Sequence, residues 1–417
     1  MSDLRVEKGA TARLDHVEGD LMVSSNGRIT AAKGGLVTVS GSAHFESNAE
    51  VDCDFQCDSL TVERGTLRST GNLVVNREAD VAHTLRVEGK FSAQRIEVGG
   101  RMYAGSVSCS GPVRVGGIVE VAETLEAGSV DVGGKVSVKG PVKTKDFDVG
   151  GKAEVGGGSI SGRVNVKGVF ASSGPLEFGE LQVYGKCTLP AGCKGQKVSA
   201  YGKLSVGGAF TCEEIKVEGF TEVRGDCSAG NIVANGWLRV HGSLAFSGTL
   251  ETSGQGEVRD DVRGADLRVG GRFRARKVIL TNKAEVAGEF LETQQGLKAK
   301  SVTVGSGTTC RGPIVAERVE LGSSLVSFAN WGTSWAGQSI RIRAIGRMTN
   351  VEDVYGGEVV LEKNSRCKRI FANRVQVAEG CTAEQVSYTD EFRGAPKGRT
   401  FFTRQPEKVD SLPPFPL

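Results

Sequence analysis

The sequence predicts an all-β protein that folds as a single-stranded right-handed β-helix, a triangular β-solenoid with about 17 residues in each turn. Three observations predict this fold. A glycine returns at the same place in unit after unit, apolar and polar residues alternate on both sides of it, and a further apolar residue follows later in the unit. Alternation with period two is typical of a strand that buries one face.

The glycine repeat is the strongest of these signals. Twelve strand-like units, beginning with the one at Ile96 and ending with the one at Ala284, start 17 residues apart except for one step of 18. The fifth residues of these units are Gly100, Gly117, Gly134, Gly151, Gly168, Gly185, Gly202, Gly219, Gly236, Gly254, Gly271 and Gly288. A glycine between two strand segments predicts a corner that needs either a positive φ or a tight approach of the backbone.

A second apolar position completes each turn. It is the thirteenth of the unit, and it holds Leu125, Val142, Cys193, Phe210, Cys227, Leu244 and Ile314. Three short strands and three corners therefore make one triangular turn, which hydrogen-bonds to the turns above and below it at ~4.8 Å. Left-handed hexapeptide helices repeat every six residues and calcium-binding rolls carry GGxGxD repeats, so this pattern favours a right-handed helix.

The regularity of the repeat divides the chain into four segments. Residues 1–78 contain irregular turns, residues 79–322 contain the regular repeat, and residues 323–393 contain further turns, one of them starting at Ile340, with an insertion that carries tryptophans. Residues 394–417 include five of the 10 prolines, and we expect them to form a flexible or extended tail. Roughly 22 turns are expected in total.

Composition and charge limit the classes of protein to consider. The chain has 52 Lys and Arg against 49 Asp and Glu, a net charge of +3, so no specific nucleic-acid recognition is expected. No apolar run reaches the ~18 residues of a membrane span, and the N-terminus lacks the apolar stretch of a signal peptide. Ten cysteines without such a signal favour a reducing compartment. We therefore expect a cytoplasmic protein that could associate with a membrane surface.

The architecture resembles that of the bactofilins, polymer-forming cytoskeletal proteins of bacteria and some archaea. The resemblance lies in short strands punctuated by glycine (IEVGG, VRVGG, VDVGG), few aromatic residues and a proline-containing tail, and it extends over most of the chain. It implies a right-handed triangular β-helix that polymerises end to end without nucleotide and acts as a scaffold, often at a membrane. This chain is longer than a bactofilin core and looks like several cores fused, and its strand pattern begins at Leu4, where bactofilins usually have a polar tail.

The cysteines are expected to be core residues rather than metal ligands. Inward positions of the repeat hold Cys187, Cys193, Cys227 and Cys310, and free cysteine behaves there as a small hydrophobe. The pair Cys53 and Cys57 lies in an irregular stretch, and zinc is its less favoured interpretation because no second pair has suitable spacing.

Signals of catalysis are weak. The four histidines are scattered, and no G-x-S-x-G, Walker A or H-E-x-x-H motif is present. Asp260 and Asp261 form the only adjacent acidic pair near an irregular turn. We expect no catalytic residue, cofactor or metal, with a carbohydrate-active β-helix enzyme as a minor alternative.

The sixth position of the unit gathers basic residues. A solenoid aligns equivalent positions, so these residues are expected to form a broken stripe along one edge. They are Arg101, Lys135, Lys152, Lys186, Lys203 and Arg272, with the cluster Arg268, Arg272, Arg274, Arg276 and Lys277 adding to the stripe. Solvated corner residues are the simpler interpretation, and a surface for an anionic membrane or polyanion is the alternative, because neighbouring like charges repel unless they are solvated or neutralised.

Aromatic residues are expected mainly to stack between turns. Tyr184 and Tyr201 are 17 residues apart, as are Phe273 and Phe290. Trp331 and Trp335 lie in the insertion, which is interpreted either as a loop folded over the solenoid or as a partner-binding loop.

The ends of the solenoid carry the main functional prediction. A terminal turn exposes unpaired backbone groups and an open apolar core, and only three residues precede the first strand-like segment. We expect self-association through Leu4, Val6 and Leu21, with Phe392, Phe401 and Phe402 at the other end, giving dimers or filaments without ATP or GTP.

Two functions follow from these patterns. The first is a bactofilin-like cytoskeletal scaffold that assembles by stacking of turns and serves an unknown cargo. The alternative is a binding rod, or less favourably a polysaccharide-acting enzyme, which uses its lateral basic face for an anionic polymer or membrane.

Overall fold

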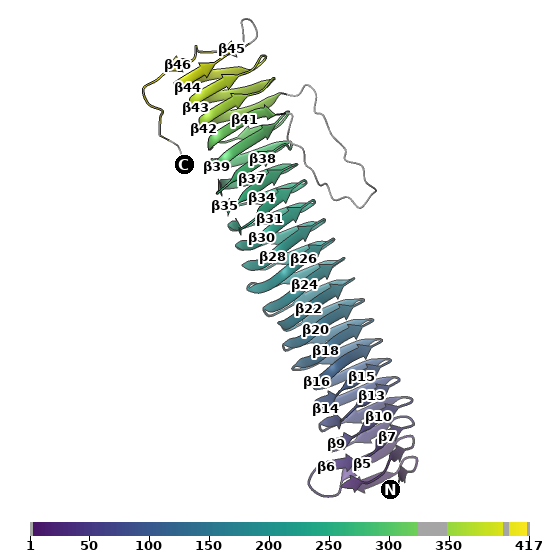
Figure 1. The fold of residues 1–417 in the computed structure, drawn as a ribbon. Coiled ribbons are helices and arrows are strands. Elements are labelled where there is room, and N and C mark those ends of the chain that lie inside the picture. Colours follow the sequence, from purple (N-terminus) through teal and green to yellow (C-terminus); the bar gives the residue numbers. More distant parts are fainter. Residues whose placement is uncertain (1–2, 324–347, 395–399, 415–417) are drawn as a thin grey trace. The chain divides into compact units, whose positions relative to one another are not determined.

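The computed structural model describes residues 3–323, 348–394 and 400–414, and it confirms the all-β prediction. Within these ranges the chain forms parallel strands and no α-helix. The strands stack as turns of a β-solenoid, about 22 in all (Figure 1). The chain divides into two compact units, Met1–Gly207 and Gly208–Leu417.

The strands of the first unit are short in its early turns and longer further on. The early strands are β1 (Leu4–Val6), β2 (Thr11–Leu14), β3 (His16–Val17), β4 (Leu21–Val23), β5 (Gly27–Ala31), β6 (Leu36–Val39), β7 (Ser42–Phe45), β8 (Ala49–Val51), β9 (Asp54–Cys57), β10 (Ser59–Val62), β11 (Thr66–Ser69), β12 (Leu73–Val75), β13 (Glu78–Val81), β14 (Thr84–Ala93) and β15 (Arg95–Val98). The later ones are β16 (Arg101–Val115), β17 (Ile118–Val121), β18 (Leu125–Val132), β19 (Lys135–Val138), β20 (Val142–Val149), β21 (Lys152–Val155), β22 (Gly158–Val166), β23 (Val169–Ser172), β24 (Leu176–Val183), β25 (Lys186–Leu189), β26 (Cys193–Ala200) and β27 (Lys203–Val206).

The second unit continues the same pattern in its own stack. Its strands are β28 (Phe210–Val217), β29 (Phe220–Val223), β30 (Cys227–Ala234), β31 (Trp237–Val240), β32 (Leu244–Phe246), β33 (Thr249–Thr252), β34 (Gln255–Val258), β35 (Asp261–Gly264), β36 (Asp266–Val269), β37 (Arg272–Leu280), β38 (Lys283–Val286), β39 (Phe290–Gly305), β40 (Thr309–Arg311), β41 (Ile314–Ser323), β42 (Thr349–Leu361), β43 (Ser365–Val377), β44 (Thr382–Arg393), β45 (Phe401–Phe402) and β46 (Glu407–Lys408).

Each turn has three faces, as the sequence predicts. In the first unit β1 pairs with β4 and β4 with β7, which defines the first face. The second face is built in the same way from β2, β5 and β8, and the third from β3, β6 and β9. All these pairings are parallel, and Leu4 lies opposite Leu21, its equivalent in the next turn. The strand ladders therefore run along the stack. Each early turn contributes one strand to each face, and in later turns a single long strand such as β16 runs through more than one face.

The core is a narrow column of inward-facing side chains. All seven residues at the predicted thirteenth position are buried, and Phe210 and Cys227, the most exposed of them, reach only 2%. Larger side chains fill the wider places, and Phe45 packs edge-on against Phe55, as Phe147 does against Phe170. Inward and outward residues alternate along most strands, so the inward thirteenth position deduced from the repeat is confirmed.

The corner glycines are required by close approach and not by a left-handed backbone. None of the twelve has a positive φ, so the second of the two predicted reasons, a tight approach of the backbone, applies. A Cβ placed on Gly185 would lie well inside 3.0 Å of the carbonyl oxygen of Gly168 in the preceding turn, and Gly168 stands in the same relation to Gly151. A side chain at this corner would therefore collide with the backbone of the preceding turn.

The register departs from the regular repeat in several places. Leu21 pairs with Ala43 in a longer step, because a loop that contains Gly34 and Gly35 extends this turn. In the second unit Val319 pairs directly with Val359. The predicted turn starting at Ile340 therefore does not come between them, and Ile340 itself lies outside the described residues. The turn from Val359 to its partner Val375 is one residue shorter than the repeat.

Part of the tail extends the solenoid instead of leaving it. Phe401 and Phe402 of β45 pair with β44, and so does β46. Beyond β46 the chain runs back along β44 and β42 (Figure 1), and Leu412 packs on Val315, Tyr355 and Phe371. Residues 400–414 thus form an extended segment that is held by strand pairing and by an apolar contact.

Candidate functional surfaces

The N-terminal edge of the first unit consists of β1, β2 and β3. Each of these strands pairs with the next turn on one side, and within residues 3–323 no strand pairs with their other side. Leu4 and Leu14 are half-buried at this edge, whereas Val6 is buried. Leu21 is fully buried in the second turn. It lies beneath the terminal surface, so its assignment to a contact surface is corrected.

The tail covers part of the C-terminal end of the second unit. Phe402 lies 5.8 Å from Phe392, measured between ring centroids, and Phe392 lies 5.7 Å from Tyr388. Phe401 is 70% exposed. The three phenylalanines predicted from the sequence thus lie at this end, two of them in contact with each other and one in solvent.

Five of the six predicted basic residues lie in one line on the second face of the first unit. Strand register places Lys135 directly against Lys152, and Lys186 directly against Lys203. We call this set the basic column, and its members are Arg101, Lys135, Lys152, Lys186 and Lys203. Ile118 and Val169 interrupt the column, so the predicted broken stripe is present in this unit.

Carboxylates partly neutralise the basic column. Lys135 Nζ lies 3.9 Å from Glu120, and Lys152 Nζ lies 2.5 Å from Glu154. The hydrogen bond from Lys152 lowers the pKa of Glu154. These pairs are exposed to water, so each stabilises the fold little. The column is therefore a mixed-charge surface at its middle turns.

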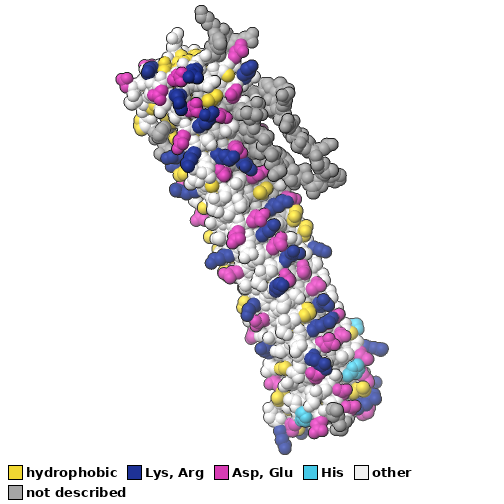
Figure 2. All heavy atoms as spheres, in the orientation of Figure 1, with side chains coloured by type: hydrophobic (Ala, Val, Ile, Leu, Met, Phe, Trp, Pro, Cys, Tyr) yellow, Lys and Arg dark blue, Asp and Glu magenta, His cyan; other side chains and the backbone are white. Residues whose placement is uncertain are grey.

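Arg272 lies in the other unit and does not extend the basic column there. Its neighbours on adjacent turns are Gln255 and Phe290, and its guanidinium donates to both carboxylate oxygens of Glu289, at 2.6 and 2.8 Å. The three other arginines of the predicted cluster also form ion pairs, which are Arg268–Glu285, Arg274–Glu292 and Arg276–Asp261. Figure 2 shows such basic and acidic side chains interspersed on the visible face.

The aromatic predictions have different outcomes. Tyr184 and Tyr201 stack at 5.0 Å with nearly parallel rings, as expected. Phe273 and Phe290 do not stack, because Phe273 points into the core opposite Leu291 while Phe290 lies opposite Arg272. One additional residue in that turn moves the two rings to different sides of the strand. Trp331 and Trp335 lie outside the described residues.

The cysteines lie in the core, both in the regular repeat and in the irregular turns. None of the ten forms a disulfide, and all are buried. Burial raises the pKa of Cys53 from 9.0 to about 11 and that of Cys57 from 9.0 to about 12. A thiol with a raised pKa is a poor nucleophile and metal ligand at neutral pH. Among the described residues no group of three or more metal-ligating side chains comes together.

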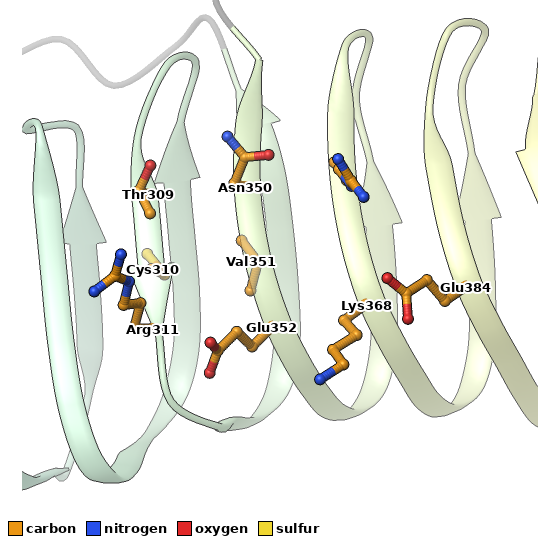
Figure 3. A pocket seen from close by; sticks show the side chains of 9 residues that line it. Thr309, Cys310, Arg311, Asn350, Val351, Glu352, Lys368 and Glu384 are labelled. Carbon is orange, nitrogen blue, oxygen red and sulfur yellow. The ribbon is translucent and has the colours of Figure 1, made fainter.

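Sequence reasoning missed a depression on the second face of the second unit. It has a volume of about 170 Å³ and lies over β40, β42, β43 and β44. Its charged lining residues are Arg311, Glu352, Arg366, Lys368 and Glu384. Figure 3 shows Arg311, Glu352, Lys368 and Glu384 on successive turns. We call it the second-face depression. The 17-residue repeat does not predict this depression. Arg311 and Glu352 are neighbours only because Thr309 pairs with Asn350, a residue much more than 17 positions later in the chain.

The fold and these surfaces define a β-solenoid repeat protein. Residues 2–56 match a family model described as repeats of unknown function (DUF5649). No curated protein and no solved structure matches the chain. Among the described residues, no helix has the length and apolar character needed to cross a membrane.

Proposed function

We propose that this protein is a structural scaffold that self-assembles end to end by stacking of turns, without nucleotide, in the manner of bactofilins. The N-terminal edge carries the proposal. An unpaired parallel edge offers N–H and C=O groups to another chain, and Leu4 and Leu14 add half-buried apolar surface beside them. The partner is a second copy of this chain, and the location we propose is the cytoplasm.

The test compares edge variants with a matched control. Leu4→Lys together with Leu14→Lys places charges on the edge strands β1 and β2, whereas Met22→Lys places one on a side chain that is 40% exposed on the lateral surface of β4. Light scattering and electron microscopy without ATP or GTP should show assemblies for the wild type and for Met22→Lys. The edge variant should remain monomeric. A wild type that is monomeric throughout the micromolar range would rule out assembly by stacking.

A second candidate function is lateral binding of an anionic membrane or polymer by the basic column. The direct stacking of Lys135 on Lys152 and of Lys186 on Lys203 favours it, because like charges one turn apart, ~4.8 Å, repel unless they are solvated or neutralised. Changing these four lysines to Gln should abolish co-sedimentation with anionic vesicles at low salt. Binding that persists in this variant, or a wild type that does not bind, would leave the column as a solvated edge.

A further inference from the structure

We propose that the second-face depression binds an acidic oligosaccharide. It is lined by side chains from two adjacent outward positions on the second face of successive turns. Thr309, Asn350 and Arg366 occupy one position. Arg311, Glu352, Lys368 and Glu384 occupy the other. Cations, carboxylates, an amide and a hydroxyl thus surround one hollow of about 170 Å³.

The cations and carboxylates of the depression lie on adjacent turns, yet they do not form ion pairs with one another. One turn earlier in the same column, Arg274 and Glu292 form an ion pair of 3.0 Å. Within the described residues, no ion pair joins the three cations of the depression to its two carboxylates, although they come from adjacent turns. Glu352 instead accepts a hydrogen bond of 2.9 Å from the N–H of Gly312, which leaves its second carboxylate oxygen for another donor. An external ligand could therefore engage these charges without first breaking an ion pair.

The mixture of groups selects the ligand class. Arg311, Arg366 and Lys368 can bind carboxylates, and a guanidinium can do so with two parallel hydrogen bonds. Glu352 and Glu384 can accept hydrogen bonds from hydroxyl groups, which a saccharide has on every ring. A nucleic acid would bring a phosphate to each nucleotide and would meet repulsion from the two carboxylates. A planar membrane does not fit a hollow surface. A sugar chain with separated carboxylates offers carboxylates to the three cations of the depression and hydroxyl groups to its two carboxylates.

A second depression lengthens the site along the solenoid. It has a volume of about 300 Å³, shares Arg366 and Glu384 with the first, and ends at Phe401 and Phe402. Together the two depressions extend from β40 to β45, about 20 Å at the spacing of parallel strands. The exposed ring of Phe401 offers an apolar surface at the end of this path. The length suits several sugar rings aligned with the axis of the turns.

The test measures binding directly. Isothermal titration calorimetry of the full chain with a galacturonic acid trimer should give saturable binding that weakens with salt. The neutral trimer of glucose should bind at least tenfold more weakly. Arg366→Gln with Lys368→Gln should weaken binding of the acidic trimer at least tenfold. Arg374→Gln, on the exposed surface of the same strand β43 but on its first face, should leave binding unchanged.

One further variant separates specific recognition from general attraction of anions. Glu352→Gln should weaken binding if the carboxylate accepts a sugar hydroxyl, whereas it should strengthen binding if the site only attracts negative charge. Strengthening would overturn the proposal, and so would equal binding of an oligo-aspartate peptide or of single-stranded DNA. These measurements do not depend on assembly, so a monomeric protein that binds the trimer would refute the proposed scaffold and leave this inference intact.

Discussion

Glycine at the corner is the residue on which the regular turns depend. Successive corners approach so closely that an added Cβ would strike the carbonyl of the preceding turn. This close approach allows hydrogen bonds between the turns next to the corner. For example, the N–H of Lys186 donates to the carbonyl oxygen of Gly168 at 2.9 Å. Glycine therefore serves packing between turns, which explains why its place in the unit is constant.

A single methyl group tests this explanation. Gly185→Ala should lower the free energy of unfolding by roughly 1–3 kcal/mol, the usual cost of overpacking. Gly207→Ala is the control, because a Cβ there would meet its nearest neighbour, the oxygen of Leu189, at 3.5 Å, an ordinary contact. Urea unfolding followed by circular dichroism measures both. Equal stability of the two variants would contradict the steric account.

The buried thirteenth position predicts a large effect of charge. Phe210→Asp would place a carboxylate in an apolar core, at a cost of several kcal/mol. Thr211→Asp changes the next residue, which is exposed, and should leave stability nearly unchanged. Thermal unfolding of the two variants checks the prediction, and similar melting temperatures would show that the assigned register is wrong.

The buried thiols predict a loss of stability at alkaline pH. Burial raises the pKa of Cys57 and of Cys310 from 9.0 to about 12 in the folded chain. Above the pKa of the unfolded thiol, the unfolded state loses protons that the native state keeps. The contribution of each buried thiol to the free energy of unfolding is therefore fully present below pH 9.0. It falls as the pH rises towards 12, by up to about 1.4 kcal/mol per pH unit for each thiol.

The comparison of variants isolates this contribution. Above the pKa of the free thiol, the urea midpoint should fall less steeply with pH in Cys57→Ala than in the wild type. This holds whatever the effect of the substitution at neutral pH. An unchanged slope would mean that other groups govern the alkaline transition.

At the scale of the element, the tail replaces part of a turn. β45 and β46 each contribute only two residues to the pairing with β44. The outward-facing Tyr355 and Phe371 stack at 5.0 Å, and each is only 9% exposed, with Leu412 packed against them. The tail is thus held by a few hydrogen bonds and one apolar contact, which marks it as a segment that opens before the core does.

Loosening that contact should release the tail alone. Leu412→Asp should speed cleavage by trypsin after Arg404 and Lys408 several-fold, with little change in global unfolding. Leu36→Asp, at an apolar side chain that is 43% exposed in the other unit, is the control. Cleavage at wild-type rates in Leu412→Asp would show that Leu412 does not hold the tail.

At the scale of the molecule, the two ends differ. The N-terminal edge is unpaired among the described residues, whereas the tail covers parts of the second and third faces at the C-terminal end. Contact between two N-terminal edges would be isologous and closed, so it would give dimers, and further growth needs the other end.

The proposed scaffold therefore predicts that the tail limits growth. Leu412→Asp should form longer assemblies than the wild type at the same concentration. Analytical ultracentrifugation and electron microscopy would measure the change. An identical size distribution for the two proteins would contradict a role for the tail as a cap.

Much of the fold could be predicted from the sequence because each turn repeats one local rule. Alternation specified the inward positions, and the glycine period specified the corners. The basic column followed from the same alignment. The prediction was wrong where a turn departs from the regular repeat. Phe290 was expected to stack on Phe273, but it lies opposite Arg272 because that turn is one residue longer. A shift of one residue carries a side chain to the opposite side of its strand.

The sequence by itself determined the strand class, the turn and the core of this protein, because alternation and steric fit act between near neighbours in the chain. Only the tertiary structure decided which charges pair, where the tail packs and where the second-face depression lies. These features join residues such as Arg311 and Glu352, or Phe371 and Leu412, whose separation is not the repeat. Their contacts depend on insertions and shortened turns, whose paths no local pattern specifies.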